Sequence, residues 1–150
     1  MVDEAVHDFR AYVHSDCGGH GPTCDDESKP CSHPTDDALL RWTAHCVFGT
    51  IARFHQGDHR FWLRKESTQQ SARNYLNLRH KLSPSLISWG STVQEQGFPL
   101  TARLDLLWPT YDEANDPTQY LHLNSTLVAP LEETETTRSV WIPPGTWIDG

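Results

Sequence analysis

The hydrophobic period of this chain changes at Gly97. Before this glycine, patterns typical of strands alternate with patterns typical of helices. After it only strand patterns occur, and the first of them has its apolar positions at Leu100, Ala102, Leu104 and Leu106. Strand–helix alternation followed by strands alone is typical of the end of an α/β unit joined to a β domain. We therefore expect an α/β unit over residues 1–100 and a β domain over residues 101–150.

The first half of the chain predicts two strands and two helical regions. Residues 9–16 and 50–55 read as strands, and the first is broken by Gly18-Gly19. Thr35 is a suitable cap for a helix that ends near Gly49, with an apolar stripe formed by Leu39, Trp42 and Cys46.

A second, longer helix is predicted from Ser67. Pro84 should break or restart it, and Gly97 follows its end near Gln96. Beyond Gly97, further strands are expected over residues 121–131 and 138–142. Pro143-Pro144-Gly145 then predicts a hairpin turn.

Size and charge exclude several classes of protein. A complete (β/α)₈ barrel takes about 250 residues, so this chain of 150 residues is too short to form one. Its formal net charge of −8 argues against nucleic-acid binding. The sequence has no run of about 20 apolar residues that predicts a membrane span. Residues 1–16 are acidic and do not resemble a signal peptide, which leaves the compartment open if the amino terminus is truncated.

Polar side chains suited to binding a sugar end both strands of the first half. Asp16 ends the first strand and His55 the second. A carboxylate accepts hydrogen bonds from sugar hydroxyls, and an imidazole donates one and accepts another. Arg53 is suited to holding a carboxylate in place. The alternative is that Asp16 caps the following turn and His55 is a satisfied interior histidine.

The cysteines offer a different interpretation. Cys17, Cys24 and Cys31 lie seven residues apart, with histidines among them. A Cys/His zinc site is one possibility, although the usual C-x₂₋₄-C spacing is missing. A disulfide between Cys24 and Cys31 is another, and free thiols are a third. The state of these cysteines and of Cys46 stays open.

Asn124-Ser125-Thr126 fits the acceptor sequence for N-linked glycosylation. It lies within the strand predicted over residues 121–131, which argues against modification.

Several short motifs occur in the same order as in one enzyme family. Asp16-Cys17-Gly18-Gly19-His20 resembles the D-x-G-G-H element at the end of the seventh barrel strand of glycoside hydrolase family 31, and Arg53-Phe54-His55 resembles the R-x-H element that ends the eighth strand. Further matches are Arg41-Trp42, Leu78–Leu82, Gly97–Leu104, Leu127–Pro130 and Pro143–Asp149. Within these matches, His80, Ala102 and Arg103 depart from the family pattern.

The resemblance implies a fold and a site. The fold would be α/β, consisting of the last strands and helices of a (β/α)₈ TIM barrel followed by the start of an antiparallel β-sandwich. In the family the matching Asp and His contact the sugar in the −1 subsite, which gives this role to Asp16 and His55. Arg53 would position them, and His20 and Trp62 would line the pocket. Trp62 replaces only part of the family's acid-Pro-Trp run. Neither a metal nor an organic cofactor is implied.

The resemblance also implies that this chain lacks the residues that break the bond. Retaining glycosidases need a carboxylate nucleophile and a carboxylic acid/base. In family 31 both are aspartates upstream of the element that matches Asp16, and residues 1–15 do not resemble their surroundings. We therefore expect a fragment of a retaining α-glycosidase acting on α-linked, glucose-type sugars. With the amino-terminal part of the barrel missing, it would be inactive alone. The alternatives are a non-catalytic remnant that binds sugars or partners, and a small zinc-binding module.

Overall fold

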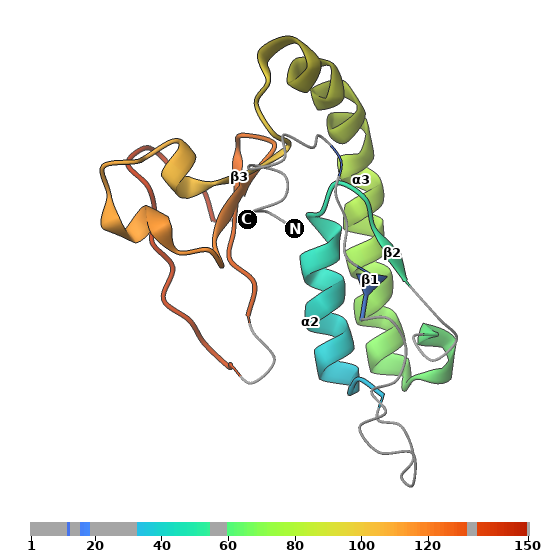
Figure 1. Ribbon diagram of the computed structural model, residues 1–150. Helices are drawn as coiled ribbons and strands as arrows, with labels where there is room; N and C mark the ends of the chain where they lie inside the picture. Colours follow the sequence, from blue (N-terminus) through green and yellow to red (C-terminus); the bar gives the residue numbers. More distant parts are fainter. Residues whose placement is uncertain (1–11, 13–15, 19–32, 55–59, 132–134, 150) are drawn as a thin grey trace, which may run out of the picture.

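The computed structural model describes residue 12 and residues 16–18, 33–54, 60–131 and 135–149 (Figure 1). Helices α2 (Asp36–Val47) and α3 (Glu66–Gln96) lie side by side, next to a short parallel pair of strands, β1 (Asp16–Cys17) and β2 (Arg53–Phe54). A separate antiparallel sheet follows, in the order β3 (Thr101–Arg103), β4 (Tyr120–His122) and β5 (Thr126–Val128). The described residues thus contain two strands of a parallel sheet and do not close a barrel.

Helix α2 begins where its cap predicts. The side-chain oxygen of Thr35 accepts a hydrogen bond of 3.1 Å from the backbone N–H of Ala38, and two aspartates occupy the favourable first turn. The predicted stripe is correct for Leu39 and Cys46, which are buried. It is wrong for Trp42, which is 39% exposed, because the face towards the interior continues through Thr43 and Val47 instead.

Helix α3 continues through Pro84, so the prediction that this proline breaks or restarts it is wrong. A proline removes one backbone hydrogen bond, but the many hydrogen bonds on both sides of it keep the segment helical. Figure 1 shows that the last part of α3, drawn in olive, leans away from the line of the first part, as expected for a helix that accommodates a proline. Gly97 ends the helix as predicted, in the left-handed conformation with φ 70°.

The strand predicted over residues 121–131 is a hairpin. β4 and β5 pair antiparallel, with Leu121 opposite Leu127 and His122 opposite Thr126. Between them Leu123 and Asn124 both have positive φ, at 52° and 53°. The turn was missed because the glycine that usually marks such a conformation is absent.

The strand that follows Gly97 is shorter than the alternating pattern predicts. β3 ends at Arg103, and Leu104–Leu106 form a 3₁₀ turn. Leu104 still reaches the interior, where it packs with Ala114 and Leu121.

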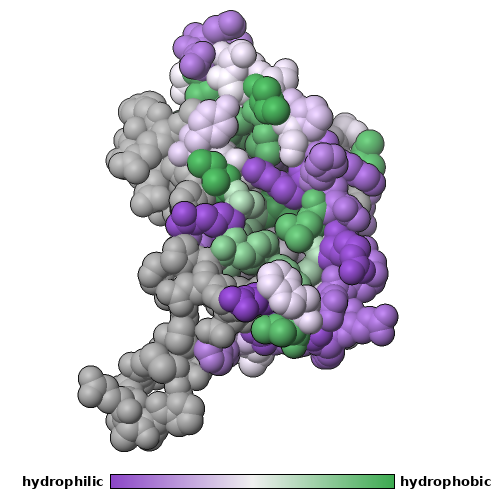
Figure 2. Space-filling view, turned by 90° about the vertical axis from the view of Figure 1, so that its right-hand side faces the viewer, coloured by the Kyte–Doolittle hydropathy of each residue, from purple (hydrophilic) through white to green (hydrophobic). Residues whose placement is uncertain are grey.

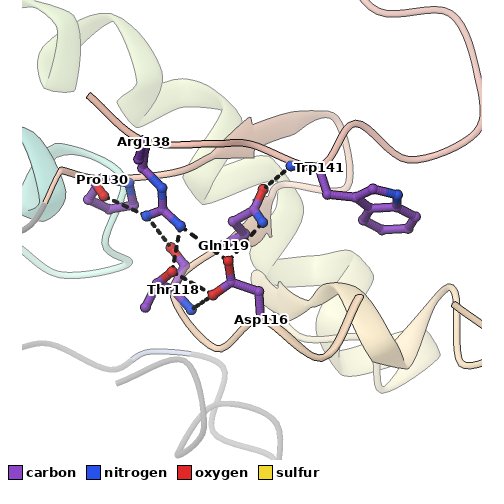
Figure 3. A network of polar contacts seen from close by, with 6 residues as sticks. All are labelled: Asp116, Thr118, Gln119, Pro130, Arg138 and Trp141. Carbon is purple, nitrogen blue, oxygen red and sulfur yellow. Dashed lines mark hydrogen bonds and ion pairs between the residues drawn. The ribbon is translucent and has the colours of Figure 1, made fainter. Parts of the chain in front are cut away.

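The segment 138–142 is not a strand, contrary to prediction, because side chains anchor it (Figure 3). The Arg138 guanidinium donates to Pro130 O (2.6 Å), Thr118 Oγ1 (2.6 Å) and Asp116 Oδ2 (3.2 Å). The backbone N–H of Trp141 donates to Gln119 Oε1 at 3.0 Å. This side-chain oxygen replaces the backbone carbonyl that a neighbouring strand would offer.

The hairpin predicted at Pro143-Pro144-Gly145 is not formed. The chain bends at residues 144–145, with Gly145 at φ 146°, but no paired strands flank the bend among the described residues. The indole N–H of Trp147 folds back and donates to Pro143 O at 2.8 Å.

Several large apolar side chains lie on the described surface. Figure 2 shows apolar residues scattered between polar ones on the face that lies on the right in Figure 1. The exposed side chains include Trp62 (69%), Leu63 (68%) and Ile87 (75%).

No helix within the described ranges is both long enough and apolar enough to cross a membrane. The division at residue 100 and the β-sandwich stay predictions.

Candidate functional site

Asp16 and Arg53 meet at the same level of two neighbouring parallel strands. Asp16 is the register partner of Arg53 in the β1–β2 pair. Nε and Nη2 of Arg53 both donate to Asp16 Oδ1, at 3.1 and 2.9 Å. The Asp16 side chain is 19% exposed and that of Arg53 is 54% exposed. The structure thus brings together two of the residues predicted to form the site, with the guanidinium oriented to hold the carboxylate.

A disulfide between Cys17 and Cys46 lies directly beside this pair. Cys17 follows Asp16 in β1, and Cys46 lies in the last turn of α2. Gly18 then takes φ 84°, a conformation that favours glycine, so the backbone turns immediately after the bonded cysteine. The sequence did not indicate this pairing, because the regular spacing of Cys17, Cys24 and Cys31 pointed to other partners.

Arg79, on α3, holds the end of α2 and the segment that leads into β2. Its guanidinium donates to the backbone oxygens of Val47 (3.1 Å), Gly49 and Thr50 (2.8 Å). These carbonyls lie at a helix end, where the helix itself supplies no donors. Arg79 thereby fixes the point from which the chain enters β2 and reaches Arg53.

The start of α2 is tied to α3 in a similar way. Asp36 accepts a hydrogen bond from Thr68 Oγ1 (2.7 Å) and pairs with Arg64 at 3.2 Å. Both ends of α2 are therefore held by residues on or just before α3.

Trp62 lies on a 3₁₀ turn, Phe61–Leu63, that is anchored beside β2. The rings of Phe54 and Phe61 meet edge to face, with centroids 4.9 Å apart. Trp62 itself is 69% exposed, and the guanidinium carbon of Arg60 lies 5.9 Å from the centroid of its ring. The side chain is thus open to a ligand.

The other two predicted site residues, His20 and His55, lie outside the described residues. The same is true of Cys24 and Cys31, which the zinc and disulfide hypotheses invoked. Cys17 is bonded to Cys46 and therefore offers no thiolate to a metal. Within the ranges that the structure describes, no three His, Cys, Asp or Glu side chains gather as metal ligands.

A cavity of about 320 Å³ lies between the helices and the hairpin, away from Asp16 and Arg53. Arg41, His45 and Phe48 line it from the α2 side, Tyr75 from α3, and residues 127–131 from the segment that begins in β5. Among the described residues, its lining includes neither Asp16, Arg53 nor Trp62, so we do not assign the sugar site to it.

His122 is an unexpected feature near this cavity. It is fully buried on β4, its ring meets Phe48 edge to face at 5.8 Å, and neither ring nitrogen finds a hydrogen-bond partner in the described part of the chain. Burial, helped by the positive charge of Arg79, lowers the pKa of His122 to about 4. The histidine is therefore neutral at pH 7 and belongs to the core that joins the sheet to the helices.

The family model for the TIM-barrel domain of glycosyl hydrolases family 31 matches residues 10–89. The chain belongs to glycoside hydrolase family 31. The match includes α2, most of α3, and both strands that carry Asp16 and Arg53. This confirms the resemblance drawn from the motifs.

Individual family 31 relatives extend the similarity beyond residue 89. Alpha-xylosidase 1 of Arabidopsis thaliana is 28% identical over 119 residues, which cover 76% of this chain and 13% of that protein. A 1,6-alpha-glucosyltransferase of Sporosarcina globispora is 23% identical over 123 residues, 79% of this chain and 10% of that enzyme.

A crystal structure of a family 31 alpha-xylosidase from a soil metagenome, complexed with xylose, has the same fold. It superposes with a TM-score of 0.71 at 24% identity, covering 87% of this chain and 22% of the other. The chain thus spans about a tenth to a fifth of the length of these family members. Its fold is a part of the family 31 barrel region with a small antiparallel sheet.

Proposed function

We propose that this chain supplies the substrate-holding side of an α-glycoside-processing site. In this proposal Asp16 and His55 bind hydroxyls of the sugar in the −1 subsite, Arg53 orients Asp16, and His20 and Trp62 line the pocket. The observation that carries the proposal is the Asp16–Arg53 pair, which sits on two adjacent parallel strands at one register level. In a (β/α)₈ enzyme, substrate-binding groups sit at the carboxyl ends of neighbouring strands.

The chemistry of the whole enzyme would be double displacement at an α-linked, glucose-type sugar. That reaction needs two further carboxylates, about 5–5.5 Å apart across the scissile bond. We assign both to a part of the enzyme outside residues 1–150. Hydrolysis and transfer share the same first step and differ in the acceptor of the second step, which is water or a second sugar. One relative is named as a glucosyltransferase, so the proposal includes both acceptors. Residues 1–100 would belong to the barrel and residues 101–150 to the β domain.

Titration calorimetry with methyl α-glucoside and methyl α-xyloside tests the binding role of this chain. We expect binding that Asp16→Asn and His55→Gln each weaken at least tenfold, which corresponds to about 1.4 kcal/mol. Asp112→Asn, an exposed aspartate on a 3₁₀ turn, is the matched control and should bind normally. Equal affinity in all four proteins would refute the assignment.

Turnover is tested by adding a barrel segment that bears the two missing aspartates. If the reconstituted protein cleaves an aryl α-glucoside and Asp16→Asn abolishes the cleavage, the enzyme proposal stands. Sugar binding without turnover in a correctly assembled complex would favour a non-catalytic remnant instead.

A further inference from the structure

Asn124, Ser125 and Thr126 lie at the turn of the β4–β5 hairpin, and all three side chains are exposed. The backbone N–H of Ser125 donates to His122 O at 3.2 Å, which closes the turn. Asn124 and Ser125 thus lie in the turn between the two strands, and Thr126 is the first residue of β5, whereas the sequence placed all three within one strand. The sequon also stands alone, because no other asparagine in the 150 residues is followed two positions later by Ser or Thr.

Apolar residues on both sides of the sequon are buried. Leu123 is 8% exposed and contacts Leu86 and Leu100, and its N–H donates to Leu100 O at 2.8 Å. On the other side, Val128 is buried against Tyr120. A bulky group on Asn124 would therefore extend into solvent without displacing a core contact. β5 is also an edge strand of the described sheet, which leaves room beside Thr126.

The disulfide between Cys17 and Cys46 adds an independent observation. Disulfides persist in secretory and extracellular compartments and are rare where thiols are kept reduced. N-linked glycosylation takes place in the same secretory compartments, on the sequon of a surface loop.

We propose that Asn124 carries an N-linked oligosaccharide. The side-chain amide nitrogen attacks the anomeric carbon of a lipid-pyrophosphate-linked oligosaccharide, and the new N–C bond forms as the C–O bond to pyrophosphate breaks. The lipid pyrophosphate leaves with the electron pair, and the amide loses one proton to a base. The hydroxyl of Thr126 is the part of the sequon that the transferase recognises. This modification is independent of the proposed sugar-binding role of Asp16.

Cell-free translation of the full chain, behind a cleavable secretion leader and with rough microsomes, tests the acceptor. We expect a slower-migrating product that peptide N-glycosidase returns to the unmodified mobility. Asn124→Gln and Thr126→Ala should remove it, whereas Thr126→Ser and Ser125→Ala should retain it. The assay does not depend on a stable fold, because transfer occurs on the nascent chain. Absence of the product in the wild type, or its persistence in Asn124→Gln, would overturn the proposal.

A second measurement tests the exposed turn. The folded protein, secreted from a eukaryotic host, is treated with the glycosidase under native conditions in ¹⁸O water and analysed by mass spectrometry. We expect Asn124 to be converted to labelled aspartate. An unglycosylated Asn124 in the secreted protein would contradict the proposal.

Discussion

Asp16 and Arg53 face each other across the parallel β1–β2 pair, and two nitrogens of Arg53 donate to a single oxygen of Asp16. Ion pairs with a half-exposed partner contribute little to stability, typically less than about 1 kcal/mol. The value of this pair therefore lies in the orientation that it imposes on the carboxylate.

Arg53→Ala should consequently separate binding from stability. We expect the free energy of unfolding to fall by less than about 1 kcal/mol, while the affinity for methyl α-glucoside falls about tenfold or more. Urea titration and calorimetry measure the two quantities. Arg73→Ala, which removes an exposed arginine from α3, is the control and should change neither. A large loss of stability in Arg53→Ala with unchanged affinity would assign the pair a structural role.

Reduction of the Cys17–Cys46 disulfide should destabilise the chain. The bond closes a loop with a sequence separation of 29 residues. Loss of such a cross-link costs about 3.5 kcal/mol through the entropy of the unfolded state. We expect a lower urea midpoint in dithiothreitol, and the Cys17→Ser/Cys46→Ser double variant should show the same low midpoint with or without reductant. Non-reducing peptide mapping that pairs Cys17 with any other cysteine would contradict the structure.

Buried histidines should make the chain sensitive to mild acid. The ordinary pKa of a histidine is about 6.5, whereas burial and the charge of Arg79 lower that of His122 to about 4. Between these values the unfolded chain binds a proton that the folded chain does not, so stability falls as the pH drops from 6.5 to 4. The full loss below pH 4 is about 3 kcal/mol.

Urea unfolding as a function of pH measures this effect. His122→Leu should flatten the profile between pH 6.5 and 4, because the apolar side chain has no proton to bind. Burial also lowers the pKa of His45, so this histidine adds a loss of stability in the same direction as the pH falls. The double variant with His45→Leu should be flatter still. His80→Leu removes an exposed histidine and should leave the profile unchanged. An acid profile that persists in the double variant would refute the assignment.

Asp116→Ala should destabilise the sheet region. Burial alone raises the pKa of Asp116, but hydrogen bonds from Thr118 and Gln119 and the charge of Arg138 outweigh it, so the pKa is lowered overall. Truncation leaves the Arg138 guanidinium, whose side chain is 11% exposed, without its carboxylate. We expect a loss of about 2–3 kcal/mol.

The same variant should change the tryptophan emission, because Gln119 loses a partner while it holds the backbone of Trp141. Asp112→Ala, at an exposed position, should cost less than about 0.5 kcal/mol. Comparable losses of unfolding free energy in the two variants would show that the Asp116 network does not stabilise the fold.

Local signals in the sequence predicted the helix boundaries well. Thr35 and Gly97 act through hydrogen bonds and backbone preferences within a few residues, so their effects are readable without the rest of the fold. Pro84 misled because a proline's local cost is outweighed by the cooperative helix on both sides.

Features that depend on distant contacts were missed. Leu123 combines a positive φ with packing against Leu86 of α3, a distant contact that nothing in the adjacent residues indicates. The Cys17–Cys46 bond likewise requires α2 to lie against β1.

At the site, the motif chemistry predicted that Arg53 would hold a carboxylate, and the structure shows that Asp16 is its partner. The sugar-binding roles of Asp16 and His55 stay predictions.

Arg79 adds a constraint on the order in which the chain matures. The backbone oxygens of Val47, Gly49 and Thr50 accept hydrogen bonds from this side chain, which is synthesised after Arg53. Until α3 has emerged and docked, the turn into β2 lacks this anchor, and Arg53 has no fixed place from which to meet Asp16. A nascent chain arrested before Arg79 would thus contain both residues of the pair without the means to align them.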